Sequence, residues 1–197
     1  MKLNRLFISI IVAYLLWLFS FNLNIFSFWI RMLISSSILF LLALLGGINL
    51  SRFNFSKLFL GIISGFLFYI LLYIGYNLAK PLVYEGAKEV YNLRLNFSLP
   101  LISLLLFFIS TSEEVFWRGY IQRNLSYNLG SVKALALTSL IYSTIHIWTL
   151  NFPLIFIALI MGFLWGFLFY VTKSLLTTIA SHIVWNQLVF IFLPLVD

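Results

Sequence analysis

Residues 98–118 read SLPLISLLLFFISTSEEVFWR, an apolar run long enough to cross a membrane that ends in two adjacent glutamates and an arginine. About 20 mostly apolar residues span a bilayer as an α-helix. A charged side chain near the bilayer centre costs about 2.5–3.5 kcal/mol on insertion scales, so Glu113, Glu114 and Arg118 must be paired or must face a polar cavity. The stretch therefore predicts a membrane-spanning helix that carries a functional polar site.

The composition extends this interpretation to the whole chain. Of 197 residues, 63% are hydrophobic and 9% are charged, whereas an ordinary soluble domain is about 25% charged. The sequence contains no cysteine, which excludes disulfides, thiolate metal ligands and a cysteine nucleophile. The net charge is +7, but the basic residues stand singly and form no stripe of the kind that binds nucleic acid. We therefore expect a polytopic protein of the lipid bilayer with no nucleic-acid partner.

Apolar runs recur along the chain and predict an all-α membrane helix bundle of about seven transmembrane helices, with a range of six to eight. The runs are 6–23, 28–48, 58–78, 98–118, 132–150, 153–172 and 174–195. The longest polar interruption, 81–97, is expected to be a loop or an interfacial helix. We expect it to divide one integral membrane domain into N-terminal helices (1–97) that complete the bundle and a C-terminal core (98–197) that carries the polar site.

The basic residues predict the orientation, because cytoplasmic loops carry an excess of lysine and arginine. With the N-terminus in the cytoplasm, the basic residues divide eight to four between the two sides. The eight are Lys2, Arg5, Arg52, Lys57, Arg118, Arg123, Lys133 and Lys173, and the other four are Arg31, Lys80, Lys88 and Arg94. We therefore expect a multi-pass protein of the cell membrane with a cytoplasmic N-terminus.

Two pairs of glycines lie four residues apart inside predicted spans, Gly61 with Gly65 and Gly162 with Gly166. Small residues at this spacing let helix backbones approach closely in a membrane. They predict helix packing, not a functional role.

Spacing indicates which polar groups can meet. Glu114 and Arg118 are four residues apart and share a helix face, whereas Glu113 is turned by about 100° from Glu114. We expect Arg118 to hold Glu114 and to leave Glu113 free to present its carboxylate elsewhere. The two acids should therefore have different roles.

A predicted turn at Gly130 relates these acids to the next helix. If one helix runs to Gly130 and Ser131 caps the following one, Glu114 and His146 each lie 16 residues from the turn. At 1.5 Å per residue, both are roughly 24 Å from it. An antiparallel hairpin would bring a carboxylate and an imidazole together within the membrane.

The last span contains His182 and Asn186, which are four residues apart and share a face. Together with the acids and His146 they predict one joint site. A carboxylate and a neutral histidine around one water can divide general-base and general-acid work. His182 and Asn186 could donate hydrogen bonds to a developing oxyanion. This chemistry is peptide hydrolysis without a covalent nucleophile.

Two other kinds of site use the same residue types. Glutamate and histidine can hold zinc, but HExxH is absent and no carboxylate stands at metal-motif spacing with either histidine. We therefore expect no metal and no other cofactor. A proton-coupled transporter also places glutamate and histidine in the membrane, but nothing here pairs broken helices in two related halves.

Three motifs occur in order on successive predicted helices: EEVFWR (113–118) followed by Gly119, YSTIH (142–146) and HIVWN (182–186). Together they resemble the signature of the CPBP family of CAAX proteases and bacteriocin-processing membrane enzymes, which includes the type II CAAX prenyl endopeptidases. The family pattern is Glu-Glu-xxx-Arg, then Phe-xxx-His, then His-xxx-Asn or Asp. The resemblance covers about residues 98–196, and Tyr142 departs from it where the family usually has phenylalanine.

The resemblance implies an intramembrane glutamic protease with a conical cavity open to the cytoplasm and no metal. It implies these roles by motif position: Glu113 with His146 activates the water, His182 with Asn186 forms the oxyanion site, and Glu114 with Arg118 supports the site. It implies a substrate that is a prenylated CAAX protein or another hydrophobic, membrane-associated peptide. Because some members confer bacteriocin self-immunity, a non-catalytic membrane scaffold or immunity protein is the alternative.

Overall fold

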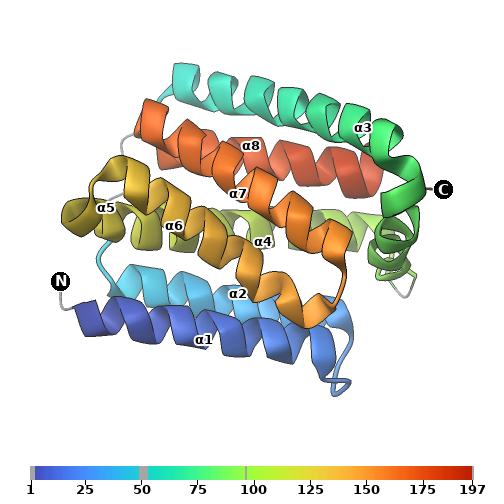
Figure 1. The fold of residues 1–197 in the computed structure, drawn as a ribbon, viewed down its shortest axis with the longest axis horizontal. Helices are drawn as coiled ribbons and strands as arrows, with labels where there is room; N and C mark the ends of the chain where they lie inside the picture. The colour runs from blue at the N-terminus through green and yellow to red at the C-terminus, as the bar shows by residue number, and fades with distance from the viewer. Residues whose placement is uncertain (1–2, 49–52, 96, 197) are drawn as a thin grey trace.

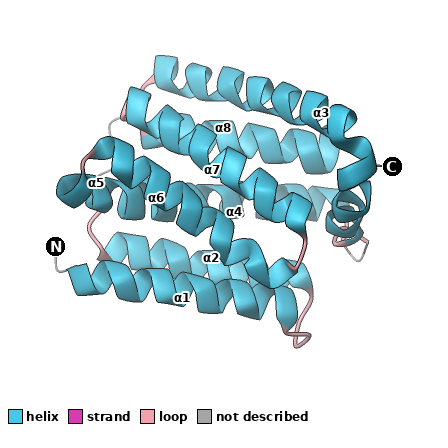
Figure 2. Cartoon of the chain, in the orientation of Figure 1, coloured by secondary structure: helices cyan, strands magenta, loops and turns pink. Residues whose placement is uncertain are grey.

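The structure is a computed structural model that describes residues 3–48, 53–95 and 97–196. All regular elements in these residues are helical (Figure 2). Within them, six helices are long and apolar enough to cross a membrane. Large apolar side chains such as Phe59 and Phe163 are exposed on the outside of the bundle, as expected where lipid is the solvent. The predicted all-α, multi-pass architecture is confirmed.

The elements follow one another along the chain as roughly aligned helices (Figure 1). They are α1 (Leu3–Asn22), α2 (Phe28–Leu45), α3 (Phe55–Asn92), α4 (Leu99–Glu114), a π-helical stretch η1 (Val115–Gln122), α5 (Arg123–Leu129), α6 (Ser131–Thr144), a 3₁₀ turn η2 (Ile145–Thr149), α7 (Phe152–Thr172), α8 (Leu175–Gln187) and a second π-helical stretch η3 (Leu188–Phe192).

Helix α4 occupies the middle of the bundle. It packs against α2 on one side and against α8 on the other, while α1 lies on α2 and α3 lies on α8. Helices α6 and α7 pack together and lie in front of α4 in Figure 1. The C-terminal end of α4, which carries Glu113 and Glu114, is therefore buried, whereas Leu104 and Phe107 earlier in the helix are exposed on the outside of the bundle.

Helix α3 is longer than the sequence suggested. The expected end of this span at residue 78 is wrong, because the helix continues through Pro81 to Asn92. Of the two expectations for 81–97, a loop or a helix, the helix is the one present over most of the stretch. Proline removes one backbone donor and crowds the preceding turn, which bends a helix without having to end it. Figure 1 shows α3 turning away from its first direction in its C-terminal part. The polar stretch after Pro81 is thus largely helical.

The expected span 132–150 is interrupted. Helix α6 ends at Thr144, a 3₁₀ turn follows, and Leu150 has a left-handed φ of 53°. This segment is therefore not among the six long helices. The predicted turn at Gly130 is present, with a φ of 79° that glycine adopts readily. Ser131, expected to cap the next helix, is instead its first residue and makes no capping bond.

The glycines of α3 allow a close approach to α8. A Cβ built on Gly61 would lie 2.5 Å from the Thr177 carbonyl oxygen, and one on Gly65 would lie 2.7 Å from that of Ser181. Such contacts are too short for a methyl group. The packing role predicted for this pair is confirmed.

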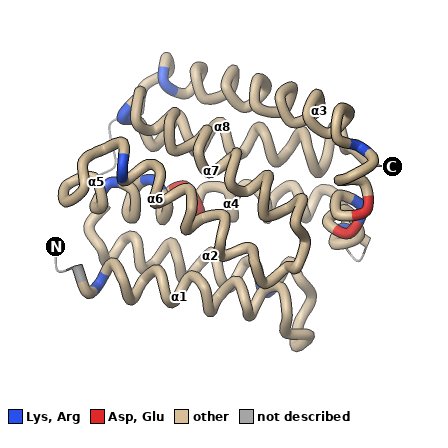
Figure 3. Tube along the Cα trace, in the orientation of Figure 1, with Lys and Arg blue, Asp and Glu red and all other residues tan. Residues whose placement is uncertain are grey.

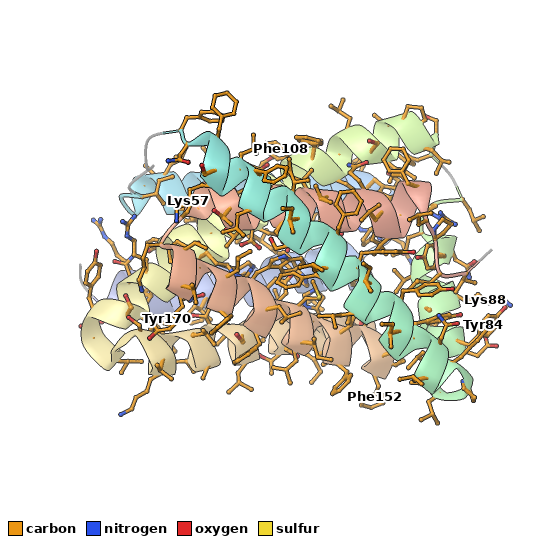
Figure 4. All side chains as sticks on the ribbon, turned by 90° about the horizontal axis from the view of Figure 1, so that it is seen from above. Lys57, Tyr84, Lys88, Phe108, Phe152 and Tyr170 are labelled. Carbon is orange, nitrogen blue, oxygen red and sulfur yellow. The ribbon has the colours of Figure 1, made fainter. Side chains whose placement is uncertain are left out.

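Lysines and arginines gather at the two ends of the bundle, with more of them at the end where the N-terminus lies (Figure 3). Figure 4 shows Lys57 and Tyr170 at one end and Tyr84, Lys88 and Phe152 at the other. This arrangement agrees with the predicted division of basic residues between two sides. Arg118 is an exception, because it was counted with the cytoplasmic residues and is completely buried.

Candidate active site

The six predicted site residues are all buried, and they lie on α4, η1, η2 and α8. Figure 3 shows acidic positions inside the bundle, behind α6. The acids are the last two residues of α4, Glu113 and Glu114, and each has different partners. The separate contacts expected from their 100° separation are thus present.

Glu114 belongs to a charged network. Its Oε1 accepts hydrogen bonds from Arg118 at 2.9 Å and from Nδ1 of His182 at 3.0 Å. Neither Glu114 nor Arg118 has any exposed surface. The ion pair predicted from the i,i+4 spacing is present, and it also reaches the histidine of the last span. Two donors on one oxygen fix the carboxylate and orient both partners.

Arg118 and Gln122 connect this network to α7. Arg118 donates to the carbonyl oxygen of Gly162 and Gln122 donates to that of Gly166, each at 2.9 Å. Without side chains, the two glycines let neighbouring elements approach the α7 backbone. A Cβ on Gly162 would lie 3.0 Å from Cδ1 of Tyr142 on α6, and one on Gly166 would lie 3.2 Å from Oε1 of Gln122. The second glycine pair therefore both packs and supplies acceptors to the site.

The Glu113 carboxylate is held by a residue of α6. Its Oε2 accepts a hydrogen bond of 2.9 Å from the hydroxyl of Tyr142. The Tyr142 ring also packs edge-on against Trp117 and lies 5.1 Å from the guanidinium carbon of Arg118. Tyr142 is the residue at which the sequence departs from the family pattern. Among the described residues, its hydroxyl makes the only hydrogen bond to the Glu113 carboxylate.

His146 lies one helical turn beyond Tyr142, on η2. Its Nδ1 is 2.8 Å from the Tyr142 carbonyl oxygen, and its Nε2 is 3.3 Å from the indole nitrogen of Trp17 on α1. No hydrogen bond in the described part of the chain joins His146 directly to Glu113 or Glu114. The hairpin at Gly130 therefore brings Tyr142 to the carboxylate, and Tyr142 connects that carboxylate to His146.

His182 and Asn186 come from α8. The imidazole of His182 stacks on Trp165 of α7, with ring centroids 3.7 Å apart and planes inclined by 22°. The Asn186 side-chain amide donates a hydrogen bond of 2.8 Å to the Ser110 hydroxyl on α4. Both side chains are thus oriented by neighbouring helices toward the α4 face that carries Glu114.

Several supporting residues were missed by sequence reasoning. Ser110 lies four residues before Glu114, so helical spacing already placed it on the same face. The sequence around Trp17 and Trp165 does not indicate that they contact the site, because a single tryptophan in an apolar helix is typical of packing or of an interfacial anchor. Their role depends on which helices become neighbours.

The described residues contain no group of three or more histidine, cysteine, aspartate or glutamate side chains arranged to hold a metal ion. The two histidines bond different groups: His182 bonds the Glu114 carboxylate, and His146 bonds the Tyr142 carbonyl oxygen.

The fold and the site together define a polytopic helical membrane protein with a buried cluster of two glutamates, an arginine and two histidines. Residues 95–188 match the family model described as type II CAAX prenyl endopeptidase, Rce1-like. This part of the chain is a domain of that family of CAAX-type intramembrane proteases, as the motifs indicated. It contains all six predicted site residues. No match was found among curated proteins or among solved structures.

Proposed function

We propose that the protein is an intramembrane endopeptidase that hydrolyses a peptide bond near the C-terminus of a prenylated, CAAX-type substrate or of another hydrophobic membrane-associated peptide. The observation that carries the proposal is the pair of adjacent, buried glutamates with separate partners. Glu114 is held by Arg118 and His182, whereas Glu113 has only the Tyr142 hydroxyl among the described residues. One acid is fixed and the other can react.

Glu113 acts as the general base in this mechanism. Tyr142 bonds Oε2, which leaves Oε1 as the oxygen that takes a proton from a water molecule. The water oxygen then attacks the carbonyl carbon of the scissile bond and forms a tetrahedral oxyanion. When the C–N bond breaks, the proton returns from Glu113 to the leaving amine. His146 orients the water and assists this proton transfer.

His182 and Asn186 stabilise the oxyanion. In the form with a proton on both ring nitrogens, His182 donates from Nδ1 to Glu114 and can donate from Nε2 to the substrate oxygen. Asn186 uses one amide proton on Ser110, so its second amide proton is available. Two carboxylates, one guanidinium and one imidazolium then carry no net charge, which limits the cost of burying them together.

The surroundings favour a hydrophobic substrate. The site lies in a bundle whose outer surface is apolar, with six candidate membrane spans among the described residues. A peptide that reaches it must leave water for lipid or protein, and a prenyl chain or an apolar sequence lowers the free energy of that transfer. The family of the 95–188 domain has CAAX prenyl endopeptidase in its description, which supports a prenylated C-terminus as the first substrate to test.

The test is cleavage of a farnesylated CAAX peptide by the purified protein in lipid bilayers. We expect the wild-type protein to cleave, and Glu113→Gln and His146→Ala to lose at least about 100-fold in rate while remaining folded. Glu85→Gln is the matched control, because Glu85 is an exposed glutamate on α3. A chelator should leave the rate unchanged.

The outcomes separate the alternatives. Inhibition by the chelator would replace the glutamate mechanism with a metal-dependent one. Full activity of Glu113→Gln would remove Glu113 from the reaction. A folded wild-type protein that cleaves neither prenylated nor unmodified hydrophobic peptides would instead support the non-catalytic scaffold or immunity protein.

A further inference from the structure

The bonds of the His146 ring determine which nitrogen carries its proton. The Tyr142 carbonyl oxygen can only accept, so Nδ1 of His146 is the protonated nitrogen that donates to it. The indole nitrogen of Trp17 can only donate, so Nε2 is the unprotonated nitrogen that accepts. Both contacts agree on one neutral tautomer. The basic lone pair of the imidazole therefore points toward α1.

Three α1 residues on one face contact the region around His146. Tyr14, Trp17 and Phe21 stand at i, i+3 and i+7, a spacing that places them on one side of a helix. The Tyr14 hydroxyl is 2.5 Å from that of Thr144, at the end of α6. The Trp17 and Phe21 rings lie 5.8 and 6.4 Å from the imidazole, measured between centroids. Helix α1 thus supports both the end of α6 and the histidine that follows it.

A buried indole N–H group in this protein does not always have a hydrogen-bond partner, so the partner of Trp17 is a specific feature of its position. Tryptophans are frequent here, and several buried indole N–H groups have no hydrogen-bond partner among the described residues. They are those of Trp117, Trp148, Trp165 and Trp185. The fully buried Trp17, by contrast, directs its N–H to the basic nitrogen of a predicted catalytic histidine.

We propose that Trp17 is a positioning residue that fixes the tautomer and the ring orientation of His146. Without the indole donor, the imidazole could turn by 180° about its bond to Cβ and present carbon atoms where its nitrogens now lie. At 3.3 Å the contact is longer than the usual N–H bond length of about 2.9–3.0 Å, so Nε2 can still share its lone pair with the proton of a reacting water.

This inference rests on the proposed peptidase reaction, and it gives the N-terminal part of the chain a role in it. Trp17 lies outside the 95–188 family domain. The proposal therefore predicts that the domain alone lacks one determinant of its own histidine geometry, which α1 supplies.

The experiment compares Trp17→Phe with Trp29→Phe in the full chain. Trp29 is also buried and donates its indole N–H, at 2.8 Å, to the Leu93 carbonyl oxygen instead of to a histidine. The chain has only two histidines, so ¹⁵N-histidine labelling gives two imidazoles, and a His182→Gln variant assigns them. We expect Trp17→Phe to move the Nε2 resonance of His146 downfield and Trp29→Phe to leave it in place.

Kinetics supply the second readout. Trp17→Phe should lower kcat by about 3- to 10-fold, the range expected for one lost hydrogen bond, with KM unchanged. When Trp17→Phe is added to His146→Ala, the residual activity of His146→Ala should not fall further, because Trp17 acts only through His146. Trp29→Phe should keep the wild-type kcat.

The two readouts separate this inference from the proposed function. An unchanged His146 resonance in Trp17→Phe, or a kcat that stays equal or rises, would overturn the positioning role. If the wild-type protein cleaves nothing, the proposed function fails, and the resonances still test the hydrogen bond. If Trp17→Phe does not fold, a nuclear Overhauser contact in the wild-type protein between the Trp17 indole proton and the His146 ring decides the geometry, and its absence would contradict it.

Discussion

Tyr142 donates a hydrogen bond of 2.9 Å from its hydroxyl to Oε2 of Glu113, and its backbone carbonyl accepts one of 2.8 Å from His146. One residue thus joins the predicted base to the predicted histidine, and the structure of the described residues has no direct hydrogen bond between those two. The i,i+4 spacing of Tyr142 and His146 on α6 and η2 makes this possible. Tyr142, which stands where the family motif has phenylalanine, is therefore part of the site in this chain.

Replacing Tyr142 by phenylalanine should separate positioning from packing. The ring contacts with Trp117 and His146 remain, and only the hydroxyl that bonds Glu113 is removed. We expect kcat to fall about 3- to 10-fold, because the Glu113 carboxylate loses its only hydrogen bond within the described residues. Steady-state cleavage in bilayers measures this. Tyr127→Phe, at an exposed position, is the control, and equal kcat in both variants would contradict the prediction.

The buried ion pair gives a prediction about stability. Arg118→Met removes the charge opposite Glu114 and leaves an uncompensated carboxylate in a site with no exposed surface. Breaking one partner of such a pair typically costs 3–5 kcal/mol, so we expect the free energy of unfolding to fall by about that amount. Equilibrium unfolding in bicelles measures it, with Lys133→Met at an exposed position as the control.

A double variant tests the cause. Glu114→Gln combined with Arg118→Met removes both charges, so it should recover part of the lost stability. If the double variant is no more stable than Arg118→Met alone, the loss comes from packing or from the Gly162 hydrogen bond and the electrostatic explanation is wrong.

Much of this site could be predicted because helical spacing is a local property. The pairing of Glu114 with Arg118 and the shared face of His182 and Asn186 follow from a period of 3.6 residues. The continuation of α3 through Pro81 could not be predicted from the sequence, because proline bends some helices and ends others, depending on tertiary support. The positions of Trp17 and Tyr142 relative to His146 and Glu113 depend on which helices are neighbours, and no residue pattern within one helix encodes that.

Ser110 supplies a matched pair of substitutions on α4. Its hydroxyl accepts a hydrogen bond from Asn186, whereas Ser103, two turns earlier, bonds the adjacent Gln187. Ser110→Ala frees the Asn186 amide to rotate away from the position proposed for the oxyanion. We expect a three- to tenfold lower kcat for Ser110→Ala and an unchanged kcat for Ser103→Ala. Similar losses in both variants would show that the effect is general helix packing between α4 and α8.

The contact between α3 and α8 gives the last prediction. Gly61→Ala places a methyl group 2.5 Å from the Thr177 carbonyl oxygen and 2.7 Å from Cβ of Ala180, so the two helices must separate. We expect overpacking of this kind to lower the free energy of unfolding by about 1–3 kcal/mol. Because α8 carries His182 and Asn186, the separation should also lower kcat.

Gly75→Ala is the control within the same helix. A Cβ at Gly75 meets no atom of the described residues within 4 Å, and alanine is the better helix former by about 1 kcal/mol. This variant should therefore be as stable as the wild type or more stable, with the same kcat, in the same unfolding and cleavage measurements. If Gly61→Ala behaves as Gly75→Ala does, then α3 does not press on α8 at this point, and the N-terminal helices do not determine the position of His182 by this contact.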